Sequence, residues 1–300
     1  TITYTTGAAF REENYKITKN PGQLSITQSS NAIVITTASR SRVYNGEKLL
    51  DDQTTHTGTL AAGDRLVVEF PADAGLTDVV TKRNEYKSYR VERSDGADVT
   101  ANYTFGEPVI GTLTVTPVAI ELTANSAAKA YDGTPLTDSG YTISNGSFVG
   151  EEGLAGVTVV GSQTLEGSSA NKITGHTLKS NTKAQNYNIT YADGTLTVSK
   201  TEKVITVTAH SRAWEYDGKE HSDGGYTVRY DGETYTVAAG ESQELPTGGL
   251  TLTATVVGTV KNVKDSAKDN NKITVVAITD AAGNVVNDQF KTITLIPGTL

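Results

Sequence analysis

Pairs of apolar residues separated by one polar position recur along the chain at a regular interval. The pairs are Ile33/Ile35, Ile120/Leu122 and Ile205/Val207, so nearly the same length of chain separates each pair from the next. Apolar residues two apart fall on one face of a β-strand, so each pair predicts a strand with one face in a core. Such a long, regular period indicates tandem modules, and we expect Ile35, Leu122 and Val207 to occupy equivalent first strands.

A second pattern closes each repeat: Asn-Tyr, an apolar residue two places on, a short polar stretch, and then Gly-x-Leu-x-Val or Ile. It reads NYTFGEPVIGTLTVTP from Asn102 and NYNITYADGTLTVSK from Asn186, with a further copy from Asn14 and an altered copy, NDQFKTITLIPGTL, from Asn287. The alternation within the copy from Asn186 is typical of two half-buried strands. Because the ADG and NPG sequences have the residue types of a reversing turn, the pattern predicts a β-hairpin.

A tyrosine followed by Asn-Gly or Asp-Gly comes after each apolar pair at the same spacing, as Tyr44 does after Ile33 and Tyr131 after Ile120. Gly adopts positive φ without strain and Asn or Asp can accept a backbone hydrogen bond, so the phrase predicts a turn. We expect the tyrosine ring to be buried, with its hydroxyl hydrogen-bonded near the turn; the alternative is an exposed ring that stacks on a sugar. The motif residues are Tyr44, Asn45, Gly46, Tyr131, Asp132, Gly133, Tyr216, Asp217 and Gly218.

These patterns divide the chain into four segments. Residues 1–28 are expected to be the C-terminal hairpin of a preceding repeat, and residues 29–116, 117–200 and 201–300 to be β-modules 1, 2 and 3. Both ends interrupt a pattern, so we expect the sequence to be part of a longer protein. Short strands with turn residues between them predict an all-β fold, a tandem array of small Ig-like β-sandwich modules with about seven strands each. β-Grasp-like modules with a short helix are the alternative.

The turn phrase and the closing phrase together resemble the YDG/MBG-type Ig-like tandem repeats of large bacterial cell-surface adhesins. The resemblance extends over the whole chain and implies an extracellular β-module repeated in tandem. The first module departs from it with Asn45 in place of Asp. The third has Asp288-Gln289-Phe290 in place of the closing Asn-Tyr and is longer than the other two.

Composition narrows the set of partners. The net charge of −8 is spread along the sequence, which has no basic cluster to bind nucleic acid or an anionic membrane. No apolar run is long enough to span a membrane as a helix. The chain has no Cys, which excludes disulfides and thiolate metal sites and is compatible with a Gram-positive cell exterior.

No catalytic or cofactor-binding pattern stands out, and we expect no enzyme activity and no cofactor. The four histidines occupy non-equivalent positions and form no metal or nucleophile motif. Two carboxylate-rich stretches, 94–102 and 279–288, leave structural calcium open, although hairpin turns explain them more simply. A shared Lys–Asn isopeptide bond is not expected two places before the motif tyrosine, where the modules carry Arg42, Lys129 and Trp214.

Two functions fit these observations. The first is a structural stalk or spacer that holds a distal adhesive region away from the cell wall, with neighbouring repeats of the same chain as partners. The second is direct binding of a host glycan or protein, most simply by module 3, where the aromatic residues cluster. We expect an extracellular location at the cell surface, with anchoring through a region outside this segment. The candidate ligand contacts are Trp214, Tyr226, Tyr230 and Tyr235.

Overall fold

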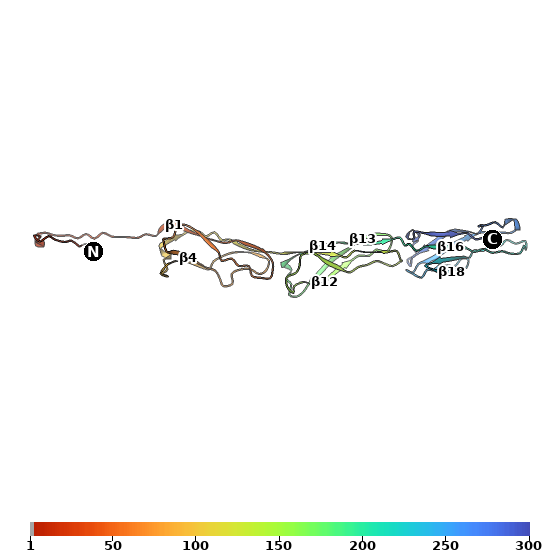
Figure 1. The fold of residues 1–300 in the computed structure, drawn as a ribbon, viewed down its shortest axis with the longest axis horizontal. Coiled ribbons are helices and arrows are strands. Elements are labelled where there is room, and N and C mark those ends of the chain that lie inside the picture. The colour runs from red at the N-terminus through yellow and green to blue at the C-terminus, as the bar shows by residue number, and fades with distance from the viewer. Residues whose placement is uncertain (1–2) are drawn as a thin grey trace. The chain divides into compact units, whose positions relative to one another are not determined.

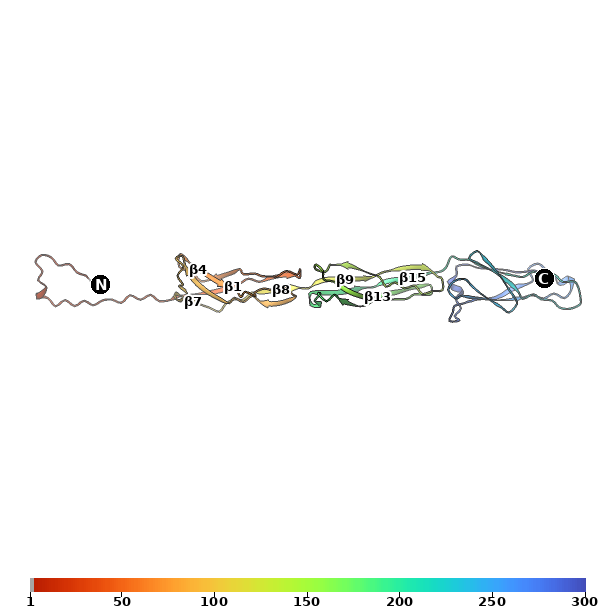
Figure 2. The ribbon, with the colours of Figure 1, turned by 90° about the horizontal axis from the view of Figure 1, so that it is seen from below.

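The computed structural model describes residues 3–300. They divide into two compact units, of which the first ends at Pro117 and the second is Val118–Leu300. Unit 1 contains module 1, and unit 2 contains modules 2 and 3 (Figures 1 and 2). The described residues form 22 strands and five single 3-10 turns, with no α-helix among them. The all-β fold of small sandwich modules is therefore confirmed, and the described residues lack the helix of a β-grasp module.

Module 1 contains eight strands in three small sheets, ordered β3-β1-β7, β2-β8-β5 and β4-β6. The strands are β1 (Ser29–Thr37), β2 (Arg40–Val43), β3 (Thr54–Thr57), β4 (Asp64–Glu69), β5 (Val80–Arg83), β6 (Ser88–Arg93), β7 (Tyr103–Phe105) and β8 (Thr112–Thr116), with the 3-10 turn η2 (Thr100–Asn102) before β7.

Module 2 contains two sheets, ordered β11-β9-β14 and β10-β15-β13-β12. Figure 2 shows β9, β13 and β15 running along a common direction. The strands are β9 (Val118–Ala124), β10 (Ala127–Ala130), β11 (Tyr141–Asn145), β12 (Leu154–Val160), β13 (Gly167–Leu178), β14 (Tyr187–Ala192) and β15 (Gly194–Ser199), with η3 (Ala184–Asn186) before β14.

Module 3 also contains two sheets, ordered β18-β17-β16-β22 and β19-β20-β21. Its greater length supplies a strand, β18, that widens the first sheet and has no counterpart in the β3-β1-β7 and β11-β9-β14 sheets. The elements are β16 (Ile205–Ala209), β17 (Tyr226–Tyr230), β18 (Glu233–Val237), β19 (Ser242–Glu244), β20 (Thr251–Val257), η4 (Val263–Asp265), β21 (Lys272–Thr279), η5 (Asn287–Gln289) and β22 (Ile293–Ile296).

The first strand of each module is central in its sheet and pairs the same way in all three. β1, β9 and β16 each pair antiparallel with one strand and parallel with the first part of the closing segment, which is β7, β14 or β22. The predicted equivalence of Ile35, Leu122 and Val207 is confirmed, since these residues lie in the three first strands and are at most 2 % exposed. The alternation is therefore the burial pattern of a strand that faces a core.

The closing segment is not a hairpin, and the prediction of one was wrong. In module 2, β14 pairs with β9, whereas β15 pairs with β10 and β13 in the other sheet. Module 1 repeats this arrangement, with β7 on β1 and β8 on β2 and β5. The glycine between the two parts turns the chain from one sheet to the other instead of reversing it.

Residues 3–28 also differ from the prediction, because they form one 3-10 turn, η1 (Glu12–Asn14), and no strand. Ser29 is the first residue of the first described strand. In the modules, the first part of a closing segment pairs with the first strand of the same module, as Tyr187 does with Val118. In the described part of the chain, the copy of the closing phrase from Asn14 forms no strand and pairs with none.

Each module contains one buried asparagine whose side chain is hydrogen-bonded to two backbone carbonyls. The side-chain amide of Asn171 donates hydrogen bonds to the backbone carbonyls of Asn125 and Asp138, both at 2.9 Å. Asn84 and Asn271 do the same to the equivalent carbonyls of their modules. All three asparagines are at most 2 % exposed. Each asparagine side chain thus joins the end of the first strand to the loop after the turn phrase. The backbone of the same asparagine pairs with the closing glycine of its module.

Candidate functional site: the joint between modules 2 and 3

The three turn phrases adopt the same local structure. The side-chain oxygens of Asn45, Asp132 and Asp217 each accept a hydrogen bond from the backbone N–H two residues on, at 3.1, 2.9 and 2.9 Å. The glycine that follows has a φ of 80°, 79° and 75° in the three modules. An L-residue adopts this conformation only with strain, which explains the Asx-Gly pair.

The motif tyrosines do not share one environment. Tyr44 and Tyr131 are 6 % and 4 % exposed, as predicted, whereas Tyr216 is 69 % exposed and the prediction of burial was wrong for it. The hydroxyl of Tyr131 also differs from the prediction, because it is buried without a hydrogen-bond partner among residues 3–300. Burial raises the pKa of this hydroxyl above its ordinary value.

Tyr131 is buried because module 3 covers it. Its ring meets the ring of Phe290 edge-on, with centroids 6.1 Å apart and an interplanar angle of 78°. Phe290 makes a second edge-on contact with Tyr230 at 6.3 Å. Tyr131 and Val198 of module 2 belong to the same hydrophobic core as module 3, and Leu136 packs against it. We call the residues at this contact the joint.

Backbone contacts add to the apolar contact at the joint. The N–H of Thr201 donates to the carbonyl of Gln289, and the N–H of Lys291 donates to the carbonyl of Thr201, at 2.9 and 3.2 Å. The Gln289 side chain is buried and its Oε1 accepts a hydrogen bond from the N–H of Glu166 in module 2. Thr201, in the link between the modules, is therefore hydrogen-bonded to module 3. Gln289 of module 3 is in turn hydrogen-bonded to the loop of module 2 that contains Glu166.

The turn phrase of module 2 fits closely against a glycine pair of module 3. A Cβ added to Gly248 would lie 2.2 Å from the carbonyl oxygen of Asp132, and one added to Gly133 would lie 2.7 Å from the Cα of Gly248. Atoms cannot approach that closely, so only glycine fits at both positions. The sequence TGG at 247–249 therefore provides the flat surface that receives the turn.

Asp132 holds the turn in shape. Its Oδ1 accepts hydrogen bonds from the Lys129 ammonium group and from the Thr134 hydroxyl, each at 2.7 Å. Burial alone would raise the pKa of Asp132, but the hydrogen bonds from Lys129 and Thr134 outweigh it and lower the pKa below the ordinary value. The Lys129 ammonium also donates to the Thr134 carbonyl, so Lys129 acts as part of the turn.

Two of the four candidate ligand contacts are core residues, so their assignment to a binding surface was wrong. Tyr226 is fully buried and its hydroxyl donates to the carbonyl of Glu241, while Tyr230 is 3 % exposed. Both alternate with buried Val228 on β17, which has a hydrogen-bonded strand on each side. Their alternate spacing therefore marks the inner face of the sheet. Tyr235 lies on β18 and is half-buried.

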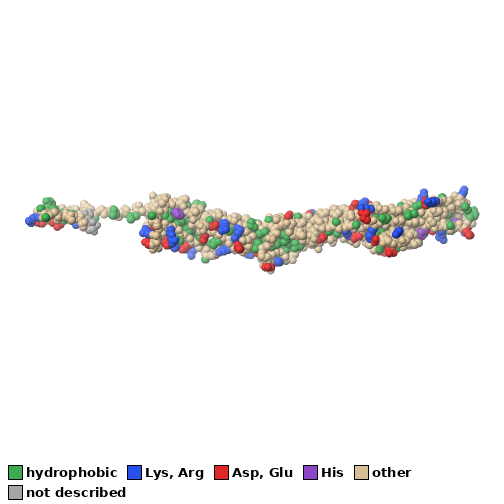
Figure 3. Space-filling model, in the orientation of Figure 1, with side chains coloured by type: hydrophobic (Ala, Val, Ile, Leu, Met, Phe, Trp, Pro, Cys, Tyr) green, Lys and Arg blue, Asp and Glu red, His purple; other side chains and the backbone are tan. Residues whose placement is uncertain are grey.

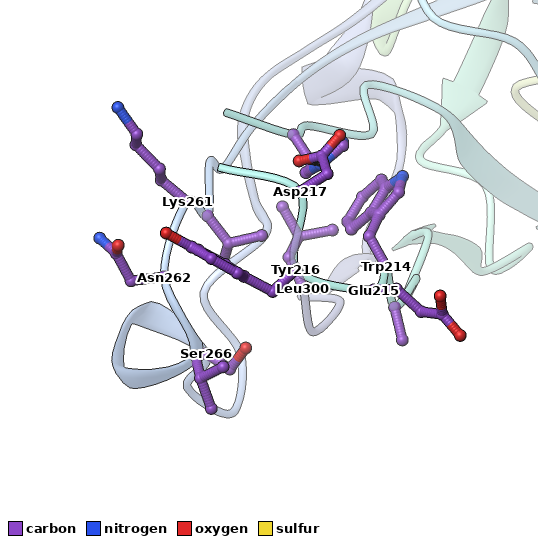
Figure 4. Close-up of a pocket in the computed structure, with 12 residues that line it drawn as sticks. Trp214, Glu215, Tyr216, Asp217, Lys261, Asn262, Ser266 and Leu300 are labelled. Atoms are coloured by element: carbon purple, nitrogen blue, oxygen red, sulfur yellow. Dashed lines mark hydrogen bonds and ion pairs between the residues drawn. The ribbon is translucent and has the colours of Figure 1, made fainter. Parts of the chain in front are cut away.

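Trp214 lies in a different place, in an open pocket that also includes the exposed Tyr216. The pocket has a volume of about 590 Å³ including space open to solvent, and its lining includes Asp217, His221, Val263 and Leu300. The Trp214 ring stacks on the His221 ring with centroids 5.0 Å apart, and His221 is 2.8 Å from Asp217. Figure 4 shows the Tyr216 ring extending away from Trp214, toward Lys261 and Asn262.

The carboxylates suggested as calcium ligands are acceptors within turns. Asp98 accepts from the N–H and hydroxyl of Thr100, and Asp280 accepts from the backbone N–H groups of Ala282 and Asn284. Within residues 3–300, no three His, Cys, Asp or Glu side chains come together in a way that could hold a metal ion. No helix in the described part of the chain is long and apolar enough to span a membrane.

No protein-family model matches the chain, and no curated protein matches it. The sequence pattern marks Gln289 and Phe290 as a departure from the repeat but not as contacts between modules, and it does not mark Gly248 at all. The third closing phrase departs from Asn-Tyr at Gln289-Phe290, which are the residues that meet module 2.

Proposed function

We propose that the chain is a non-catalytic spacer, a stalk segment of a large bacterial surface adhesin that presents a distal adhesive region away from the cell wall. The observation that carries this proposal is the joint, where Tyr131 and Val198 of module 2 are part of the hydrophobic core of module 3. Rotation about such a joint exposes apolar surface to water, which is unfavourable. Unit 2 therefore resists bending.

The short links between modules support the same function. Only Pro117 separates β8 from β9, and residues 200–204 alone separate β15 from β16. Pro117 has a fixed φ and no backbone N–H to donate. In the second link, the backbone of Thr201 is hydrogen-bonded to Gln289 and Lys291.

The surface fits a spacer better than a binding module. On the face that Figure 3 shows, acidic and basic side chains are mixed along the molecule and are not gathered into one charged patch. The net charge of the chain is −8. From the resemblance to YDG/MBG-type repeats, the proposal also takes an extracellular location and neighbouring repeats of the same chain as partners. Binding of a host glycan or protein by module 3 is the weaker alternative, because Tyr226 and Tyr230 are buried and the extra length of the module forms β18.

Small-angle X-ray scattering on the whole chain tests the proposal. Modules of roughly 35 to 40 Å each, arranged end to end, give a maximum dimension on the order of 100 Å or more, against roughly 40 Å for a compact globule of this length. A maximum dimension near about 60 Å means that the modules pack side by side, and it contradicts a spacer function.

A further inference from the structure

The first and last parts of module 2 lie side by side over their whole length. Residues 118–130 contain β9 and β10, and residues 187–199 contain β14 and β15. We call these two stretches the entry run and the exit run. β9 pairs in parallel with β14 in one sheet, and β10 pairs in parallel with β15 in the other. The entry run is therefore hydrogen-bonded to the exit run in both sheets of the module.

The two runs keep one register through the change of sheet. Val118 lies opposite Tyr187 in the first sheet, and Ala127 lies opposite Leu196 in the second. The same number of residues separates the two pairs on each run, and neither parallel pairing contains a register shift. The two pairings therefore form a single parallel ladder that is bent where the runs pass from one sheet to the other.

A serine side chain bridges the bend in this ladder. The N–H of Thr195 donates to Ser126 Oγ at 3.0 Å, which joins the exit run to the entry run between the two sheets. Ser39 and Ser211 accept the equivalent hydrogen bond in modules 1 and 3, at 3.0 and 2.9 Å. The contact between the runs therefore continues where regular strand pairing is interrupted.

The closing glycine stops the runs from sliding past each other. A Cβ on Gly194 would lie 2.1 Å from the Asn125 carbonyl oxygen. Movement of the exit run toward its own C-terminus would bring Asp193 and then Ala192 to this place, and both residues have a Cβ. The Asn125 carbonyl is also held from the other side, because it accepts a hydrogen bond from the Asn171 side chain at 2.9 Å.

Tension along the chain acts on this ladder in shear. The chain reaches module 2 at the start of the entry run and leaves it at the end of the exit run. Because the runs are parallel, these two points lie at opposite ends of the ladder, and a pull on them slides one run along the other. All the hydrogen bonds of the ladder then resist together. A pull on two points at the same end would break them one after another.

We propose that the entry and exit runs of module 2 form a shear clamp, so that the module bears tension along the chain. This inference goes beyond the spacer function, which requires resistance to bending and not to stretching. Module 1 has a weaker form of the clamp, because its pairing of Ser29 with Tyr103 and of Ile33 with Phe105 contains a register shift. Module 2 is therefore the stronger of the two under tension.

Pulling single molecules of the full chain with optical tweezers compares two directions through the same module. The chain has no cysteine, so pairs of engineered cysteines provide the attachment points. Ala119→Cys with Ser199→Cys pulls the ladder in shear, whereas Ala119→Cys with Gln185→Cys pulls at the starts of both runs and opens it from one end. All three positions are exposed. At one loading rate, we expect a rupture force several-fold higher in shear, because forced unfolding reports the unfolding rate along the pulled direction.

Equal rupture forces in the two directions overturn the inference. Both variants contain the same folded module, so a difference in stability cannot imitate a difference between directions. The scattering experiment on the spacer is independent of this comparison. If the chain is long in solution and the two forces are equal, the clamp is disproved and the spacer function stands.

Ser126→Ala supplies a second check, because it removes the acceptor of the Thr195 N–H and interrupts the ladder at its bend. We expect it to lower the rupture force in shear. Ser168→Ala is the matched control, since Ser168 Oγ bonds to Thr197 Oγ1 from β13 and takes no part in the contact between the runs. A Ser126→Ala variant that loses no more force in shear than Ser168→Ala does would contradict the clamp.

Discussion

At the residue scale, the feature that most clearly unites the modules is an amide that the hydrophobic pattern does not indicate. Asn84, Asn171 and Asn271 each satisfy two backbone carbonyls with one side chain. The sequence contains a signal for two of them, since NKIT occurs at residues 171–174 and again at 271–274. In module 1 the neighbours differ, so the phrase alone does not reveal Asn84.

Replacing Asn171 by Ala removes the donor from two buried carbonyls. We expect Asn171→Ala to lower the free energy of unfolding of unit 2 by roughly 2 to 4 kcal/mol, because each buried acceptor left unpaired costs about 1 to 3 kcal/mol. Denaturant unfolding measures the change. Asn188→Ala is the control, since Asn188 is exposed on β14 and its loss changes stability by about 0.5 kcal/mol or less. Equal effects of the two substitutions argue against the role of Asn171.

The hydroxyl of Tyr131 predicts an unusual mutational pattern. Tyr131→Phe is expected to leave the stability of unit 2 unchanged or to raise it, because the hydroxyl is buried without a partner. Tyr131→Ala removes the ring from the joint and is expected to cost roughly 3 to 5 kcal/mol.

Tyr187 provides the matched comparison for the Phe substitution. Its hydroxyl donates to Glu152 at 2.6 Å and accepts from the N–H of Val149 at 3.0 Å. Tyr187→Phe is therefore expected to cost about 1 to 2 kcal/mol. If Tyr131→Phe destabilises unit 2 as much as Tyr187→Phe does, the Tyr131 hydroxyl has a partner and its place in the joint has to be reconsidered.

At the element scale, the sequence predicts the strands well and their partners poorly. Alternation places Ile120, Leu122, Leu196 and Val198 on buried faces, as observed. It does not show that the two halves of the closing phrase join different sheets, because a turn and a sheet switch both use Gly beside Asp or Pro. The aromatic residues of β17 were misassigned for a similar reason, since alternation does not distinguish the inner face of a sheet from the outer one.

The closing glycine marks the place where the chain switches sheets. A Cβ added to Gly194 would lie 2.1 Å from the Asn125 carbonyl oxygen and 2.5 Å from that of Ala124, and Gly111 and Gly298 show the same close approach. We expect Gly194→Ala to destabilise unit 2 by about 3 kcal/mol, because the obstructing atoms are backbone atoms that cannot move aside.

Gly175→Ala is the control for this substitution. Gly175 lies in β13 with nothing within 4 Å of an added Cβ, so Ala there is expected to change stability by less than about 1 kcal/mol and to favour the folded state. Both free energies come from denaturant unfolding followed by circular dichroism. A Gly194→Ala variant as stable as the wild type would show that the switch does not depend on close backbone contact.

At the scale of the whole molecule, the departures of module 3 from the repeat have structural roles. Phe290 replaces the tyrosine whose hydroxyl, in modules 1 and 2, bonds to Asp64 or Glu152, and it contacts Tyr131 instead. Gln289 bonds to the loop of module 2, and Gly248 receives its turn. These residues are irregular in the repeat because they serve the contact between modules, which a single-module pattern does not contain.

The central claim is that modules 2 and 3 form one stiff body, and a distance measurement tests it directly. The chain has no cysteine, so Lys172→Cys and Lys272→Cys, at exposed positions of β13 and β21, give two unique sites for spin labels. Pulsed electron paramagnetic resonance is expected to give one narrow distance distribution, which Tyr131→Ala broadens. A distribution that is already broad in the wild-type chain, and that Tyr131→Ala leaves unchanged, would contradict the claim.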